Sequence, residues 1–278
     1  MPDRDLDITK FSYKSYRKLK KSLGEFDAVV ECNEIAIREF IEKANTEDSE
    51  KYIQQLSIKH RIKVDNVDFV KFSSRIRQFY IVSVTQQFEQ FLADFRNEWK
   101  KYFPDRAWIP RDRDSGETEL DNCLKNIQLT KYLVEFGNYI NHYDYYRLVR
   151  NFTAHTDRDI KAIERSLKKI EMPIDNICRI PNSLENIDFT DFHILTNVVK
   201  HIAFVICQRS KPDNDIIAQV LFDISKENKA NAYNGLKKLK NDDIRYRKAL
   251  SSFVVTNFGR ISESDLEQIT NKLKSLLA

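Results

Sequence analysis

The chain has 278 residues, of which 32% are charged and 41% hydrophobic, and its formal net charge is +4. That length permits one large domain or two smaller ones with a buried core. Only 5 glycines and 6 prolines occur, which argues against a many-stranded β-sandwich and favours a helix-rich fold. The small positive charge is compatible with an acidic partner such as RNA but does not require one.

Neither the cysteines nor the N-terminal segment indicates export. The cysteines are scattered and form no C-x-x-C pair, so we expect reduced, buried thiols at Cys32, Cys123, Cys178 and Cys207. The first residues contain no apolar signal segment, and no stretch approaches the ~18 apolar residues that a membrane span requires. We therefore expect a cytoplasmic protein with no membrane partner.

Apolar residues at helical spacing predict a first helix over about residues 8–43, with an interruption near Gly24. The first half of this segment carries a basic run that consists of Lys14, Arg17, Lys18, Lys20 and Lys21. The run is either a solvated helix face or a contact with an RNA backbone. Polar residues 45–66 then separate this helix from the next.

A long amphipathic helix is predicted over residues 67–102, because its apolar residues fall on one broad face. Pro104 ends that helix, and residues 104–118 are expected to form a charged loop or lid that gates a site or binds a partner. A second helix is predicted over 119–137, followed by a helical segment over 139–169. Residues 170–188, which contain two prolines, predict a short extended excursion or a small hairpin.

Residues 190–209 are apolar nearly all round, which predicts a buried helix. Residues 211–215 are expected to be a linker, and residues 216–278 predict three short helices. We accordingly divide the chain into an N-terminal helical region (1–66), a central helical domain (67–210) and a C-terminal helical region (211–278).

The most informative stretch is residues 150–155, with the sequence RNFTAH. The guanidinium of Arg150 is suited to grip a phosphodiester with two hydrogen bonds, and the imidazole of His155 is suited to move protons near neutral pH. Residues five apart lie about 140° apart around a regular helix. We therefore expect either a helix break between Ala154 and His155 or a groove lined from two sides.

The residues that follow favour the break. Thr156 and Asp157 come directly after the stretch, and Asp157 is a suitable N-cap for a new helix. The structural alternative is that His155 caps a helix end while Arg150 forms an exposed ion pair with Asp157 or Glu164.

The RNxxxH pattern of Arg150, Asn151 and His155 resembles the signature of HEPN domains, many of which are metal-independent ribonucleases. The resemblance covers about residues 67–209 and includes the order of the predicted helices around the pattern. It is closest to the HEPN type of bacterial RNA-targeting defence and toxin systems. It implies an all-α, HEPN-like helical bundle with a short extended or hairpin excursion, joined here to N-terminal helices and a C-terminal helical appendage.

The resemblance also implies a homodimer whose two RNxxxH segments face each other across a composite cleft, with no cofactor and no metal. In the implied reaction, an RNA 2′-hydroxyl attacks the adjacent phosphodiester. His155 acts as general base or acid, Arg150 stabilises the charge on phosphorus, and Asn151 orients the groove or the substrate. DNA lacks the 2′-hydroxyl and should resist cleavage. The expected role is that of a toxin or effector under the control of a regulatory protein partner.

Three further residues are candidate supports of this site, namely Glu89, Tyr146 and Thr156. Glu89 either orders the Arg150 guanidinium or is a solvated helix residue. Tyr146 and its neighbouring tyrosines either stack on RNA bases or pack in the core or a dimer seam. Two other hypotheses stay open for the whole chain: a non-catalytic HEPN module that binds a partner protein or a nucleotide, and a helical scaffold without a ligand.

Overall fold

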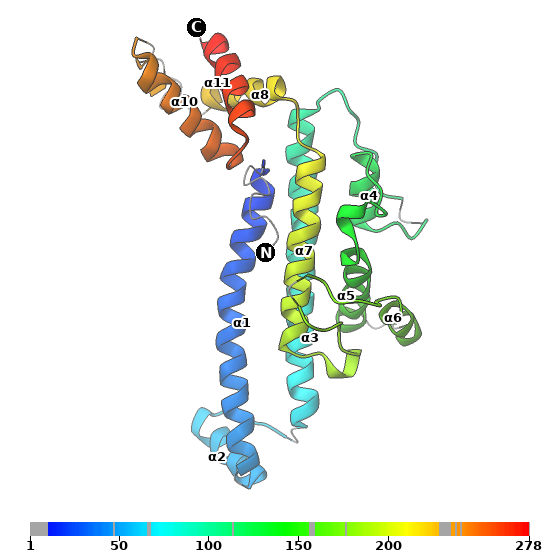
Figure 1. Ribbon diagram of the computed structural model, residues 1–278. Helices are drawn as coiled ribbons and strands as arrows, with labels where there is room; N and C mark the ends of the chain where they lie inside the picture. Colours follow the sequence, from blue (N-terminus) through cyan, green and yellow to red (C-terminus); the bar gives the residue numbers. More distant parts are fainter. Residues whose placement is uncertain are drawn as a thin grey trace. The chain divides into compact units, whose positions relative to one another are not determined.

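The computed structural model describes residues 11–46, 48–65, 68–112, 114–155, 159–175, 177–227, 235–236, 238–239 and 241–277. All regular secondary structure in these residues is helical, which confirms the predicted all-α fold. The helices are shown in Figure 1. In chain order they are α1 (Lys14–Thr46), α2 (Ser49–His60), α3 (Phe69–Tyr102), α4 (Glu119–Asn126), α5 (Tyr139–Ala154), α6 (Ile160–Leu167), α7 (Phe189–Arg209), α8 (Asn214–Glu227), α10 (Asp243–Phe258) and α11 (Glu263–Leu277).

Three predictions about the helices are wrong. Helix α1 continues through Gly24, because one glycine costs a helix only about 1 kcal/mol relative to alanine. Helix α2 occupies most of the stretch predicted to be a polar separator, and the side chain of Asp48 caps its first turn by accepting from the Lys51 N–H. Helix α4 ends at Asn126, since Gln128 adopts a left-handed backbone with φ 59°.

The excursion between α6 and α7 is irregular in its described residues. Its described residues contain turns and a short 3-10 helix, η2 (Leu184–Asn186), but no strand, so the hairpin alternative is wrong. The described part of the C-terminal region is helical, as predicted, and α11 packs against both α8 and α10. All four cysteines are free, but only Cys123 and Cys207 are buried, so the expectation of burial is wrong for Cys32 and Cys178.

The chain divides into two compact units, each assembled from separated segments. Unit 1 comprises residues 1–18, 89–133 and 203–278, and unit 2 comprises residues 19–88 and 134–202. The predicted division after residues 66 and 210 follows the chain order and stays a prediction.

In unit 1 the core gathers around the buried side chain of Tyr13. Its ring makes edge contacts with Phe95 (5.1 Å between centroids) and Tyr102 (5.4 Å), both on α3. Its hydroxyl donates to the carbonyl of Ser210 at the end of α7. The segment just before α1 is therefore held by two other helices of this unit.

In unit 2 an aromatic cluster joins three helices. Phe26 on α1, Tyr80 on α3 and Phe192 on α7 contact one another at 5.9 to 6.4 Å between ring centroids. Tyr143 brings α5 into the same unit through an edge contact of 5.1 Å with Phe88. The helix that carries the RNxxxH pattern is thus part of a packed core.

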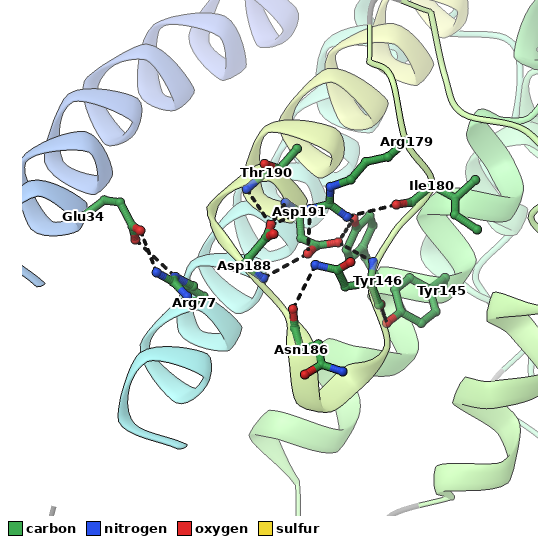
Figure 2. Close-up of polar contacts among 11 residues, drawn as sticks. Glu34, Arg77, Tyr145, Tyr146, Arg179, Ile180, Asn186, Asp188, Thr190 and Asp191 are labelled. Carbon is green, nitrogen blue, oxygen red and sulfur yellow. Dashed lines mark hydrogen bonds and ion pairs between the residues drawn. The ribbon is translucent and has the colours of Figure 1, made fainter. Parts of the chain in front are cut away.

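A buried ion pair links α1 to α3 in unit 2 (Figure 2). Glu34 is only 3% exposed, and its carboxylate accepts two hydrogen bonds from Arg77, at 2.6 and 3.2 Å, and one from Arg38 at 3.0 Å. Burial of Glu34 opposes its ionisation, but the hydrogen bonds and charges of Arg77 and Arg38 outweigh that effect and lower its pKa. The pair is therefore ionised at neutral pH.

Replacing Arg77 by alanine is expected to lower the free energy of unfolding by about 2 kcal/mol. The Glu34 carboxylate would lose two of its three hydrogen bonds, while Arg38 would limit the loss. Urea denaturation of the wild type and of Arg77→Ala at neutral pH measures this difference.

The same pair should make stability depend on acid. Because the folded-state pKa of Glu34 lies below the ordinary value of 4.5, its contribution is complete above that pH and is lost as the pH falls further. The wild type should therefore lose more stability than Glu34→Gln on acidification to about pH 3.5. Glu25→Gln, at an exposed pair with Lys21, is the matched control and should keep the wild-type acid dependence. An unchanged acid dependence in Glu34→Gln contradicts this account.

Candidate functional site

The residues of the RNxxxH pattern lie at the C-terminal end of α5. The helix ends at Ala154, and His155 is its C-cap with an extended backbone (φ −122°, ψ 158°). The His155 N–H donates to the Asn151 carbonyl at 3.0 Å. The predicted break between Ala154 and His155 is confirmed.

Asn151 has a hydrogen bond to each of the two candidate catalytic residues. Its side-chain Oδ1 accepts from Nη1 of Arg150 at 3.1 Å, and its main-chain carbonyl accepts from the His155 N–H. The amide therefore orients the guanidinium, while the backbone fixes the residue that bears the imidazole. Arg150 and Asn151 are half-buried and His155 is exposed, so all three side chains have access to solvent.

The next helix begins at a cap that the sequence did not identify. Asp159 is the N-cap of α6, and its side chain accepts from the Ala162 N–H at 2.9 Å. The predicted cap, Asp157, and the candidate support Thr156 both lie outside the described residues. Helices α5 and α6 pack against each other, so the end of α5 that carries the pattern belongs to a pair of packed helices.

Three tyrosines in the middle of α5 belong to the core. Tyr143, Tyr145 and Tyr146 are each at most 2% exposed, which confirms the packing alternative for these three rings and leaves none of the three accessible to a base. The Tyr146 hydroxyl donates to Oδ1 of Asp191 at 2.8 Å, and the Tyr145 hydroxyl donates to the Asn182 carbonyl. Tyr146 therefore supports the site only by holding α5, one turn before Arg150.

The buried carboxylate of Asp191, on α7, accepts hydrogen bonds from the excursion and from α5 (Figure 2). Its Oδ1 accepts from Tyr146 and from the Asn182 N–H at 3.0 Å, and its Oδ2 accepts from the Asp188 N–H at 2.9 Å and from Arg179 at 3.2 Å. Burial raises the pKa of Asp191, and the hydrogen bonds oppose that rise. Helix α5, the excursion and α7 thus meet at one carboxylate.

The same aspartate completes a capping box at the start of α7. Oδ1 of Asp188 accepts from the main-chain N–H groups of Thr190 (2.8 Å) and Asp191 (3.2 Å), while the Asp188 N–H donates back to the Asp191 side chain. Sequence reasoning missed this pair of aspartates. The signal was present, since Asp-x-x-Asp directly before a long apolar run is a helix start.

Two further predictions stay open. Glu89 is half-buried on α3 and belongs to unit 1, whereas Arg150 belongs to unit 2, so support of Arg150 by Glu89 stays a prediction. Part of the basic run is used inside the protein, because Arg17 donates to the carbonyl of Thr256 and Lys18 pairs with Asp94 at 2.6 Å. A contact of this run with RNA also stays a prediction.

Neither a metal cluster nor a membrane span is found in the part of the chain that the structure describes. No three His, Cys, Asp or Glu side chains there are grouped so that they could hold a metal ion. Among the same residues, no helix combines the length and the apolar character needed to cross a bilayer.

Removal of the Asp191 carboxylate is expected to destabilise unit 2. Asp191→Ala should lower the free energy of unfolding by roughly 3 kcal/mol, chiefly because the buried Tyr146 hydroxyl and the main-chain N–H groups of Asn182 and Asp188 lose their acceptor. Asp191→Asn should also lower the free energy of unfolding, because the amide NH2 group would replace one carboxylate oxygen and would face N–H and O–H donors. Urea denaturation, combined with hydrogen exchange of residues 177–190, measures both effects.

Asp223→Ala on α8 is the matched control for this experiment, because Asp223 is exposed and should change stability by less than about 0.5 kcal/mol. If Asp191→Ala behaves like that control, the carboxylate does not hold the three segments together.

The chain was also compared with known proteins. No protein-family model, no curated protein and no solved structure matches the chain.

Proposed function

We propose that the chain is a metal-independent endoribonuclease whose active site contains Arg150, Asn151 and His155. The proposal is carried by the arrangement at the end of α5: a guanidinium oriented by the neighbouring amide, and an exposed imidazole on the first residue after the helix. Its second support is the resemblance of the RNxxxH pattern, within an all-helical chain, to HEPN ribonucleases.

The proposed reaction uses only groups that these residues supply. The 2′-hydroxyl of a ribose loses its proton to a general base and attacks the adjacent phosphorus, and the bond from phosphorus to the 5′-oxygen breaks. The 5′-oxygen takes a proton from a general acid, and the product end is a 2′,3′-cyclic phosphate. His155 serves as base or acid, and Arg150 stabilises the charge that develops on the phosphoryl oxygens.

One arginine and one histidine are too few to act together as acid, base and charge stabiliser. A two-fold axis doubles the number of groups, because each copy presents the same surface to the other. The proposed enzyme is therefore a homodimer with a composite cleft, in which one histidine is the base and the other the acid.

The proposed biological role is that of a toxin or effector in bacterial defence, which requires restraint by a regulatory partner. The loop after α3 is a candidate surface for that partner. Its centre is fixed, because Asn126 bonds both the N–H and the carbonyl of Ile109, at 2.6 and 3.0 Å. Beyond that anchor, Asp112 and Asp114 are exposed and offer charge to a partner.

The test is incubation of the purified protein with labelled single-stranded RNA in the presence of EDTA. Cleavage is expected to persist in EDTA and to fall at least about 100-fold in both Arg150→Ala and His155→Ala. RNA with 2′-O-methyl groups and DNA of the same sequence should remain intact, and the cut ends should carry cyclic phosphate. Arg147→Ala is the matched control, because Arg147 lies on the same helix but pairs with Asp144.

Cleavage that persists in both variants, or that requires a divalent cation, contradicts the proposal. So does a wild-type protein that sediments only as a monomer while it cleaves. Binding of RNA with no cleavage under any condition favours the non-catalytic module instead.

A further inference from the structure

The end of α2 and the turn that follows it expose aliphatic and basic side chains together. Ile58 is 73% exposed, Ile62 61% and Val64 42%, although aliphatic side chains usually find a packed position. The basic residues among them are all exposed and are Lys59, His60, Arg61 and Lys63. We name residues 57–64 the α2 tip.

The α2 tip has a defined backbone. Arg61 is left-handed (φ 56°) and its N–H donates to the Ile58 carbonyl, while the Ile62 N–H donates to the Ser57 carbonyl at 3.1 Å. The Ser57 hydroxyl donates to the Ile62 carbonyl and accepts from the Val64 N–H at 3.2 Å. These bonds fold the chain back beside the last turn of α2.

Two residue choices at this turn run against local stability. The left-handed position after a helix usually holds glycine, and an arginine there is strained. The apolar residue that follows usually packs on the last turn of the helix. Here that residue is Ile62, and the residue of the last turn that it would cover is the polar Ser57, so Ile62 stays exposed. Both choices put a basic or apolar group on the surface.

The rest of α2 is held by its other face. Phe40 on α1 contacts Tyr52 on α2 (6.1 Å between centroids), and it also contacts Phe69 and Phe72 on α3 (5.7 and 5.9 Å). Figure 1 shows α2 beside the C-terminal end of α1, within unit 2. The packing of α2 therefore does not require the exposed residues of the tip.

We infer that the α2 tip binds the surface of an anionic lipid bilayer. Its aliphatic side chains suit insertion among headgroups, and its lysines and arginine suit the negative charge of the lipids. Residues 57–64 contain no acidic side chain, and Asp65 just beyond pairs with Lys63 at 3.2 Å.

Other partners fit the α2 tip less well. Single-stranded nucleic acids stack their bases on aromatic rings, and the tip has no Phe, Tyr or Trp. We expected no membrane partner from the sequence because it contains no segment long and apolar enough to span a bilayer. Peripheral binding to a membrane surface does not need such a segment. This inference is independent of the ribonuclease proposal.

The test is co-sedimentation of the full chain with vesicles of phosphatidylcholine alone or mixed with phosphatidylglycerol. Binding is expected only with the anionic vesicles and should weaken as salt is added. The double variants Lys59→Gln/Lys63→Gln and Ile58→Ser/Ile62→Ser should each reduce binding roughly tenfold. Unchanged circular dichroism would show that both variants remain folded.

The control variant is Ile244→Ser/Lys248→Gln on α10, which removes an exposed isoleucine and an exposed lysine from another surface and should bind like the wild type. The inference is overturned if the wild type does not sediment with anionic vesicles, or if the tip variants bind as well as the control. Binding of a labelled RNA that the tip variants abolish, with no vesicle binding, also overturns it.

Discussion

Unit 2 depends on the buried carboxylate of Asp191. An ionised carboxylate costs several kcal/mol to bury and is tolerated only when donors surround it. Here α7 supplies the carboxylate, and the donors come from the excursion and from Tyr146 on α5. The carboxylate and its donors lose these hydrogen bonds if the three segments do not dock, so the start of α7, the excursion and α5 are expected to become ordered together.

Because α5 is fixed in the core by this carboxylate, the position of the residues at its C-terminal end is also fixed. Tyr146 is fully buried, Arg150 one turn later is half-buried, and His155 after the helix is exposed, so the chain passes from core to solvent within three turns. Polar groups at the end of a helix fixed in a core are held more precisely than groups on a long loop. Arg150 has that advantage directly. His155 shares it through one backbone hydrogen bond to Asn151.

The sequence was sufficient to predict that α3, α5 and α7 are helices, because apolar residues recur at helical spacing along each of them. Helix α2 was missed because it buries no residue completely, and its pattern is therefore weak. The role of Asp191 was missed for a different reason. Its cap is local, but its burial depends on Arg179 and Tyr146, which lie 12 and 45 positions away. The RNxxxH pattern predicted the break after Ala154 but not the hydrogen bond by which Asn151 orients Arg150.

The charges of this chain are informative only once their partners are known. Arg77 and Arg179 each pair with a buried acidic side chain, so these two cations stabilise the fold. A single guanidinium oriented by an amide, as at Arg150, suits one phosphate in a fixed position, because its planar donors impose a direction. Two flexible lysines beside exposed isoleucines, as at the α2 tip, impose no direction and suit an extended anionic surface. The same residue types therefore support two different kinds of recognition, and their neighbours determine which.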